Sequence, residues 1–442
     1  MDLDRRPVTT RGPLRGTQRE GLRAFGLDVT YERAEGSRLW YRDPDERPVW
    51  DFLGGYGSTF FGHNHPALSR EAIEFLEQRG VVHGQASVRA ASERLAAVLA
   101  RRLRQSTGDA FELLLANTGA EAVELAAKHA HEALALERDD LARRLDALPH
   151  SSGPLEWSPE ALALLRRQGL EDGPQILQRI AGHNRRVLLT APLHVAVADS
   201  YHGMSARALS LTDDPLGRFG RGPRVRDVRF VGRSDPDELR RLLQELQGTL
   251  LRVRTSAGRF GLEALACTPV AAFFMEPIQG EGGIHPVPAE VAQAWQAACR
   301  EHRVPLVADE IQSGLGRSGS FLHCEQIGLR PDYVLLGKSL GGGLAKLSAV
   351  AIATERFLPG FTLQHPSTFA GDELSSCIAL RALALLDEEH AARVASEKGA
   401  RLLLGGEVPK APGAFYPPTV LADVRKGMPA YDEELFGPVA AI

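Results

Sequence analysis

A lysine stands directly after an apolar run, in a position that suits covalent chemistry. Lys338 follows Tyr-Val-Leu-Leu-Gly at residues 333–337 and precedes Gly341, Gly342 and Gly343. Partial burial at a strand end lowers the pKa of an amine, which makes it a nucleophile toward an aldehyde and later a carrier of protons. The glycines would let the backbone approach a flat ring. The alternative is a solvated surface lysine, although such a lysine seldom follows so apolar a run.

A carboxylate ends a second apolar run. Asp309 comes directly after Pro-Leu-Val-Ala at residues 305–308. An ionised carboxylate there is costly unless a cation meets it. A protonated pyridine nitrogen is such a cation. The chemistry of pyridoxal 5'-phosphate (PLP) needs this pairing, because a pyridinium ring accepts electrons from a carbanion far better than a neutral pyridine does. Considered by itself, Asp309 is more simply a helix cap or a salt-bridge partner.

Two further segments have the chemistry of a phosphate site. LLLANTGAEAVELAA is typical of a strand, a tight turn and a helix, with Thr118, Gly119 and Ala120 at the helix N-terminus. Free backbone amides and the helix dipole favour an anion there. An ordinary N-cap by Asn117 or Thr118 is the simpler alternative. HPSTFAGDEL adds the hydroxyl of Thr368 in a glycine-bearing turn, which by itself is also compatible with a plain turn.

Aromatic and acidic side chains occur in two more loops. YHGMSA contains Tyr201 and His202, and a flat ring there suits stacking on a cofactor. MEPIQGEGG contains Glu276 and Glu281 with Gln279 between them. These carboxylates would line a substrate cavity or gate an arginine, and the alternative is a structured loop.

The segments that must position these residues alternate between short apolar runs and helical patterns, which is typical of a mostly parallel sheet covered by helices. In such sheets, ligands bind where strands end and helices begin. The expected strands cover residues 111–116, 187–190, 271–275, 306–308 and 333–336, and the expected helices include 120–135, 236–246 and 288–302.

Composition narrows the class of function. The 442 residues are 43% hydrophobic and 24% charged with a formal net charge of -4, so they show neither a nucleic-acid-binding excess of basic residues nor an acidic tail. No apolar stretch is long enough for a membrane span, and the first residues have no signal-peptide core. We expect a cytoplasmic protein that acts on small molecules. Its four cysteines form neither a C-x-x-C pair nor a metal-ligand cluster, so we expect reduced thiols and no metal.

Together these segments resemble the class III aminotransferases among the fold-type-I PLP enzymes. The resemblance covers residues 30–385, and its seven motifs stand in the family's order: WDFLGGYGSTFFGHNHPAL, NTGAEAVELA, YHG, EPIQGEGG, DEIQSGLGRSG, PDYVLLGKSLGGG and HPSTFAGDELSS. Seven motifs in the same order do not plausibly arise by accident.

The resemblance assigns roles around the cofactor ring. It implies that Lys338 is the Schiff-base lysine, Asp309 the partner of the pyridine nitrogen, and Gln312 the hydrogen-bond partner of the ring hydroxyl. It further implies that Tyr201 stacks on the ring and that His202 is its companion. The implied reaction is a ping-pong transamination from an amine or amino acid to a keto acid or aldehyde.

The resemblance also implies a phosphate cradle and a partner. Thr118, Gly119 and Ala120 match the family's phosphate loop, and Thr368 matches a threonine that reaches the phosphate from the neighbouring subunit. A homodimer with shared active sites follows. We also count Glu276 among the cofactor-binding residues. Two alternatives remain: another PLP reaction on the same scaffold, by an aminomutase or racemase, or a catalytically disabled PLP-binding remnant.

The expected fold is a fold-type-I PLP-dependent transferase of the α/β class. We expect residues 1–60 to start a small domain, residues 61–370 to form the large PLP-binding domain with a mostly parallel sheet and helices on both faces, and residues 371–442 to be a truncated or replaced C-terminal part of the small domain.

Two departures from the family are visible. The stretch between Lys128 and Tyr201 is unusually long, which predicts a helical insertion at about 131–185 that acts as a flap or docking surface near the cofactor. Residues 399–442 resemble a late segment of aldehyde dehydrogenases, in which the residue matched by Glu434 contacts a nicotinamide cofactor, with Phe436 nearby. The rest of that enzyme is missing, so we expect no dehydrogenase activity. A natural fusion, a truncated gene product and an assembly error are all compatible with this pattern.

Overall fold

The computed structural model describes most of the chain between residues 29 and 388. The described ranges are 29–41, 48–84, 86–146, 156–173, 175–213, 227–256, 259–364 and 367–388, together with Arg23 and three short strands near the C-terminus.

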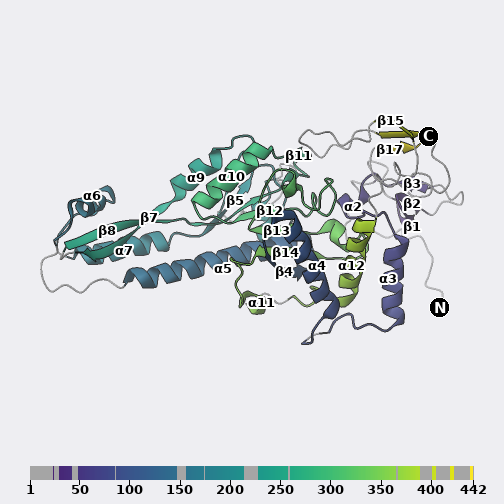
Figure 1. The fold of residues 1–442 in the computed structure, drawn as a ribbon, viewed down its shortest axis with the longest axis horizontal. Coiled ribbons are helices and arrows are strands. Elements are labelled where there is room, and N and C mark those ends of the chain that lie inside the picture. Colours follow the sequence, from purple (N-terminus) through teal and green to yellow (C-terminus); the bar gives the residue numbers. More distant parts are fainter. Residues whose placement is uncertain are drawn as a thin grey trace.

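A seven-stranded sheet forms the centre of the molecule (Figure 1). Its order is β4 (Phe111–Ala116), β14 (Ser348–Ala353), β13 (Tyr333–Leu336), β12 (Leu306–Asp309), β9 (Val270–Met275), β5 (Leu193–Val197) and β6 (Val228–Val231). The strands from β13 to β6 pair in parallel, whereas β14 is antiparallel to both of its neighbours. The expectation of a mostly parallel sheet is confirmed.

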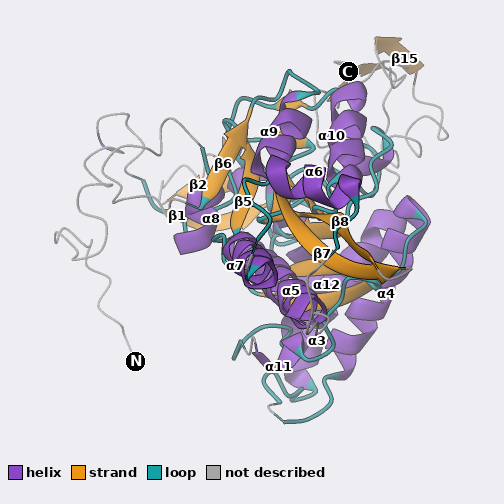
Figure 2. Ribbon diagram, turned by 90° about the vertical axis from the view of Figure 1, so that its left-hand side faces the viewer, coloured by secondary structure: helices purple, strands orange, loops and turns teal. Residues whose placement is uncertain are grey.

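Both faces of the sheet are covered, which explains why its strands are nearly continuous apolar runs. Alternate residues point to opposite faces: Phe273 and Val334 contribute to one core and Phe274 and Leu335 to the other. On the first face lie α4 (Ala90–Thr107), α9 (Glu238–Leu246), α10 (Ala289–Glu301) and α12 (Glu373–Glu388), and on the second lie α5 (Gly119–Asp146) and α8 (Ala206–Leu211) (Figure 2).

Most of the expected elements are confirmed. The strands expected at 111–116, 271–275, 306–308 and 333–336 and the helices expected at 120–135, 236–246 and 288–302 are present, with bounds that differ by a few residues except for α5, which continues to Asp146. The strand expected at 187–190 is wrong. Val187 and Leu188 form the last turn of the amphipathic helix α7 (Ile176–Leu188), and Val187 packs near Leu141 and Leu250. The strand follows at β5.

An arm extends from the sheet, as Figure 1 shows. It consists of the C-terminal half of α5, α6 (Pro159–Arg167), α7 and the hairpin of β7 (Gly248–Ser256) and β8 (Arg259–Cys267). The inserted helices were expected, but the hairpin comes from another part of the sequence. Since α7 leads into the start of β5 and β8 into the start of β9, the arm joins the edge opposite to the carboxyl ends of the parallel strands. The expected position near the cofactor is therefore wrong.

The arm has a core of its own. Trp157, Leu165, Ile180 and Leu251 are buried in it. The buried side chain of Asn184 satisfies the backbone of Leu251 on the edge of β7 that does not pair with β8. Its Nδ2 donates to Leu251 O over 2.8 Å, and its Oδ1 accepts from Leu251 N over 2.7 Å.

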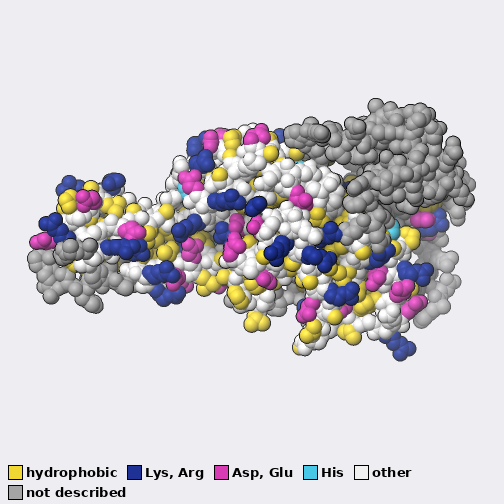
Figure 3. Space-filling model, viewed as in Figure 1, with side chains coloured by type: hydrophobic (Ala, Val, Ile, Leu, Met, Phe, Trp, Pro, Cys, Tyr) yellow, Lys and Arg dark blue, Asp and Glu magenta, His cyan; other side chains and the backbone are white. Residues whose placement is uncertain are grey.

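The surface is of mixed charge. On the face in Figure 3, basic and acidic side chains of the described residues are interspersed over the arm and the sheet domain. None of the described helices is both long and apolar enough to cross a bilayer.

The remaining elements lie around the sheet domain. The antiparallel strands β1 (Tyr31–Glu35), β2 (Arg38–Tyr41) and β3 (Pro48–Trp50) precede α2 (Gly54–Gly57) and α3 (Pro66–Glu77). Short elements follow later in the chain: β10 (Ile278–Gln279), β11 (His285–Pro286), α11 (Phe361–Gln364) and 3-10 turns at His323–Glu325 and Lys338–Gly341.

Three strands are described near the C-terminus. They are β15 (Arg401–Leu404), β16 (Thr419–Ala422) and β17 (Val439–Ala441), and they form a separate sheet. Glu434 and Phe436 lie outside the described residues. The division into domains at residues 60 and 370 stays a prediction.

Asn184→Ala should destabilise the arm. It leaves the N–H and C=O of Leu251 buried without partners, which costs about 1 to 3 kcal/mol per group. Urea unfolding monitored by circular dichroism measures the change. The exposed neighbour Arg185 provides the control, because Arg185→Ala should leave the free energy of unfolding almost unchanged. Equal stability of both variants would contradict the role of Asn184.

Candidate functional site

The residues singled out by chemistry converge at one edge of the sheet. Asp309 is the last residue of β12, and Lys338 follows β13 by two residues. Glu276 comes directly after β9, and Tyr201 follows β5. Because these four strands are parallel, their carboxyl ends meet at the same edge.

Close backbone contacts join the loops at this edge. A Cβ on Gly203 would lie 2.7 Å from Cβ of Ala120, so the YHG loop packs directly on the start of α5. The Ile311 side chain lies against both Gly119 and Gly337. Ile311, two residues after Asp309, thereby holds together the start of α5 and the residue before Lys338.

Gln312 faces the loop after β9. Its side-chain amide lies so close to Gly280 that a Cβ at that position would overlap with it. The sequence predicted that Gln312 belongs to the site, and the structure brings it beside the loop of Glu276.

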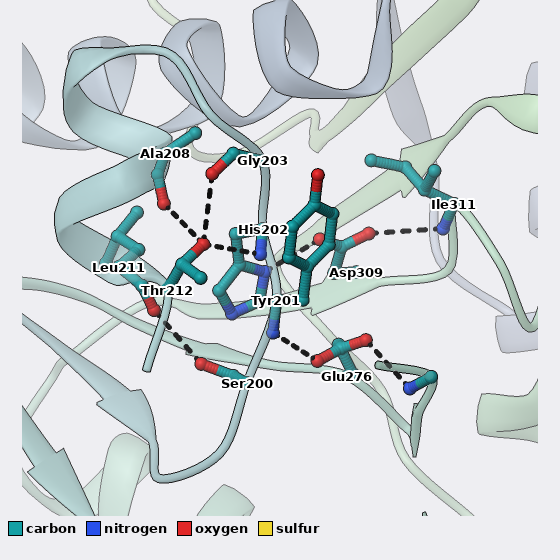
Figure 4. Close-up of polar contacts among 11 residues, drawn as sticks. Ser200, Tyr201, His202, Gly203, Ala208, Leu211, Thr212, Glu276, Asp309 and Ile311 are labelled. Carbon is teal, nitrogen blue, oxygen red and sulfur yellow. Dashed lines mark hydrogen bonds and ion pairs between the residues drawn. The ribbon is translucent and has the colours of Figure 1, made fainter. Parts of the chain in front are cut away.

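Asp309 and His202 form a buried pair (Figure 4). Nδ1 of His202 lies 2.7 Å from Oδ2 of Asp309, and the side chains are 0% and 5% exposed. The other carboxylate oxygen accepts the backbone N–H of Ile311 over 3.2 Å. Burial opposes the charged imidazole, but the hydrogen bond and the charge of Asp309 outweigh it and raise the pKa of His202.

Glu276, directly after β9, supports the loop that carries Tyr201 and His202. Its Oε1 accepts the backbone N–H of Tyr201 over 2.8 Å, and its Oε2 accepts that of Gly280 over 3.2 Å. Burial raises the pKa of Glu276 to about 7, and the negative charge of Asp309 acts in the same direction. Glu276 is thus a proton-binding group close to neutral pH.

Lys338 has the properties expected of a nucleophilic amine. Its backbone has φ 42°, a left-handed conformation that is uncommon outside glycine. Burial lowers the pKa of its amine, while the charges of Asp309, Glu276 and Glu281 oppose this shift. The amine is therefore partly desolvated and lies within electrostatic reach of all three carboxylates.

The expected phosphate loop is the start of the helix α5. The hydroxyl of Thr118 accepts the N–H of Glu121 over 3.2 Å, which is the ordinary capping interaction that the sequence also allowed. Gly119 and Ala120 begin α5. Thr368 is exposed beside Ser367, whose hydroxyl bonds to Glu121 and Asn117 at the same helix start.

Sequence reasoning missed Thr212. Its buried hydroxyl accepts the N–H of His202 over 2.9 Å and lies within hydrogen-bonding distance of the carbonyls of Gly203 and Ala208 (Figure 4). These contacts fix the backbone of His202, the hydrogen-bond partner of Asp309. A lone threonine after Leu-Ser-Leu has no pattern that indicates this contact.

These residues fit the cofactor that the sequence predicted. A desolvated amine and a buried carboxylate at adjacent strand ends suit the aldehyde and the pyridine nitrogen of PLP, and the start of α5 offers backbone donors to a phosphate. In the described part of the chain, no cluster of three His, Cys, Asp or Glu side chains is arranged to hold a metal.

The model of the family "Aminotransferase class-III" matches residues 23–406. The chain belongs to this family. Its reaction is therefore PLP-dependent transamination. The "Aldehyde dehydrogenase family" model matches residues 385–442, which confirms the resemblance of the C-terminal segment and begins earlier than expected.

Similar proteins agree with this assignment. The mitochondrial ornithine aminotransferase of Arabidopsis thaliana is 28% identical over 93% of this chain and 68% of its own. The diaminobutyrate–2-oxoglutarate transaminase of Marinococcus halophilus is 25% identical over 85% and 73%. The crystal structure of ornithine aminotransferase from Toxoplasma gondii superposes with a TM-score of 0.58 at 25% identity and covers 88% of this chain and 78% of that one.

Stability should depend on the protonation of Glu276. Its folded pKa of about 7 lies above its ordinary value of 4.5, so the folded state binds the extra proton. The resulting stabilisation is complete below pH 4.5 and is lost as the pH rises to 7. Glu276→Gln has no titrating proton at this position, so its free energy of unfolding should lack this decrease between pH 4.5 and 7.

Urea unfolding of both proteins, freed of cofactor, between pH 4.5 and 8 measures the difference. The expected change in the difference between the two unfolding free energies is on the order of a few kcal/mol. Parallel pH profiles would contradict the assignment.

Proposed function

We propose that this enzyme transfers an amino group from a small primary amine to a 2-oxo acid, with Lys338 as the catalytic lysine. The observation that carries the proposal is a partly desolvated amine beside a buried His202–Asp309 pair. Bound PLP supplies an aldehyde that accepts the amino group and a pyridinium ring that withdraws electrons from the neighbouring carbon.

Lys338 has two tasks in this proposal. Burial lowers the pKa of its amine, so a larger fraction is unprotonated and nucleophilic at neutral pH, the form that would hold PLP. With PLP and substrate bound, the same Nζ would be placed to move a proton at the reacting carbon. The nearby carboxylates supply the negative field that stabilises the protonated form of Nζ between these transfers.

Asp309 would pair with the ring nitrogen of bound PLP, and His202 orients its carboxylate. The bond from His202 Nδ1 occupies one carboxylate oxygen and limits rotation of the group. Tyr201 is the proposed stacking residue, because its backbone is fixed by Glu276 on the same loop. Gln312 is the proposed donor to the ring hydroxyl.

Thr118, Gly119 and Ala120 are the proposed phosphate ligands. They stand at the start of the 28-residue helix α5, where backbone N–H groups and the helix dipole favour an anion. Thr368 is the proposed contribution of a second subunit, for which its exposure leaves room.

The relatives support the substrate classes. They are named for ornithine and for diaminobutyrate with 2-oxoglutarate, which are amino acids with a second, terminal amine and a 2-oxo acid. We therefore propose a donor with a terminal primary amine and an acceptor of the 2-oxo acid class.

Lys338→Ala should abolish the visible or near-ultraviolet absorbance of lysine-bound cofactor and reduce turnover by at least about a thousandfold. Absorbance spectra and an assay for the carbonyl product, with ornithine and 2-oxoglutarate as first substrates, measure both effects. Lys346→Ala changes an exposed lysine of the same loop and serves as the control. Undiminished turnover of the Lys338 variant would defeat the assignment.

We also propose a homodimer with shared active sites. Phe369, next to Thr368, is 59% exposed, and Val81 and Val88 are 66% and 76% exposed. The segments that carry these side chains lie side by side. The ring centroids of His83 and Phe369 are 5.1 Å apart, Val82 O accepts the N–H of Glu373, and Arg89 donates to Ala370 O. An apolar surface of this kind supports a subunit interface.

Phe369→Asp should weaken the dimer by at least about tenfold, because the interface would bury an unpaired charge. Sedimentation analysis over a range of protein concentrations measures the dissociation constant. Leu189→Asp, at an exposed apolar position on the arm, is the matched control. A wild-type protein that remains monomeric, or a Phe369 variant that dimerises as tightly, would refute the interface.

A further inference from the structure

Arg317 lies at the rim of the site on the loop that follows Asp309. Its Nη2 donates to the carbonyl of Gly57 over 2.9 Å, and its guanidinium lies 4.9 Å from the centroid of the Phe60 ring. These two contacts fix the direction of a long side chain that would otherwise be free to move. The residue is exposed, so a ligand in solution is able to reach its side chain.

The same carbonyl joins Arg317 to the lysine loop. Gly57 O also accepts the hydroxyl of Ser339 over 3.1 Å, and Ser339 is the residue after Lys338. The guanidinium of Arg317 and the hydroxyl of Ser339 therefore lie within two hydrogen-bond lengths of each other. The positive charge of Arg317 reaches the amine of Lys338 and lowers its pKa.

The other charges that act on Lys338 are negative. Among the described groups with a marked effect, Asp309, Glu276 and Glu281 are carboxylates, and Arg317 is the cation. A substrate carboxylate that enters this region is repelled by the acids, so it needs a cation at a distance from them. Arg317 supplies that cation on the side of Gly57 and Ser339.

We propose that Arg317 binds the carboxylate of the 2-oxo acid acceptor and thereby determines acceptor specificity. This inference rests on the proposed transamination. One of the five N–H groups of the guanidinium is hydrogen-bonded within the described part of the chain, which leaves donors for a carboxylate. A guanidinium pairs with a carboxylate through two parallel hydrogen bonds, a geometry that a lysine does not reproduce.

The test compares two acceptors with one donor. With ornithine as donor, steady-state kinetics are measured for 2-oxoglutarate and for pentanal, an aldehyde without a carboxylate. Arg317→Gln should raise the KM for 2-oxoglutarate by about 10- to 100-fold, the effect of losing a hydrogen-bonded charge pair. The KM for pentanal should change by less than about threefold. Arg317→Lys should recover part of the lost affinity for 2-oxoglutarate, because it restores the positive charge without the two parallel hydrogen bonds.

Ser339→Ala is the matched control for a purely structural role. It removes the other hydrogen bond to Gly57 O and leaves the cation in place. It should therefore leave the ratio of the two KM values close to that of the wild type, even if both constants change. The proposal is overturned if Arg317→Gln impairs both acceptors equally, or if Ser339→Ala shifts the ratio as strongly.

The same data separate this inference from the proposed function. If the wild-type enzyme forms no carbonyl product and shows no spectral change with any amine donor tested, the proposed substrate classes fail. If it turns over both acceptors and Arg317→Gln leaves their KM ratio unchanged, transamination stands and the assignment of Arg317 alone is wrong.

Discussion

The site is organised around a carboxylate that is buried at the end of a strand. Asp309 is only 5% exposed, and its charge is costly at that position unless partners surround it. His202 provides one partner and the backbone of Ile311 another. The sheet makes these contacts possible, because β5 and β12 are parallel and both flank β9, which directs their following loops to the same edge. Thr212 then fixes the backbone of His202 from a separate element.

A second consequence of this arrangement is the protonation of Glu276. Two buried carboxylates near each other repel, and the less well-compensated one takes up a proton more easily. Asp309 has a histidine partner, whereas Glu276 accepts two backbone N–H groups and has a pKa of about 7. The two acids therefore divide the tasks. Asp309 pairs with His202, and Glu276 supports the loops of Tyr201 and Gly280 largely as a neutral group in mildly acidic solution.

The sequence predicted the parts of this fold that depend on local patterns. Asp309 ends a fully buried strand and Lys338 follows another, and an apolar run of four or five residues is the pattern expected of such a strand. The strand at 187–190 was wrong because Val187 and Leu188 end a helix whose buried positions lie four residues apart, at Ile176, Ile180 and Asn184. The short apolar run at 187–190 was interpreted without the helical spacing of the residues before it.

Contacts between distant segments were not predictable in the same way. Asn184 bonds to Leu251, Thr212 to His202, and Arg317 to Gly57, and each of these pairs depends on packing that no local pattern encodes. The hairpin β7–β8 was missed for the same reason, since its partner helix α7 lies far away in the sequence.

The arm and the site share one continuous element, the helix α5. At about 1.5 Å per residue, its 28 residues extend for roughly 42 Å, from Gly119 at the carboxyl edge to the arm beyond the opposite edge. The buried side chain of Arg138 anchors this helix where the arm begins: its Nη1 donates to Thr190 O and its Nη2 to Thr268 O.

Thr190 and Thr268 precede β5 and β9, the strands that lead to Tyr201 and Glu276. A displacement of the arm would act first on this anchor, and it would reach the site only along α5 or through those two strands. The strands are packed on both faces of the sheet and resist such a shift. The anchor therefore joins the arm to the sheet at the edge opposite to the chemistry, and α5 is the element that runs from one to the other.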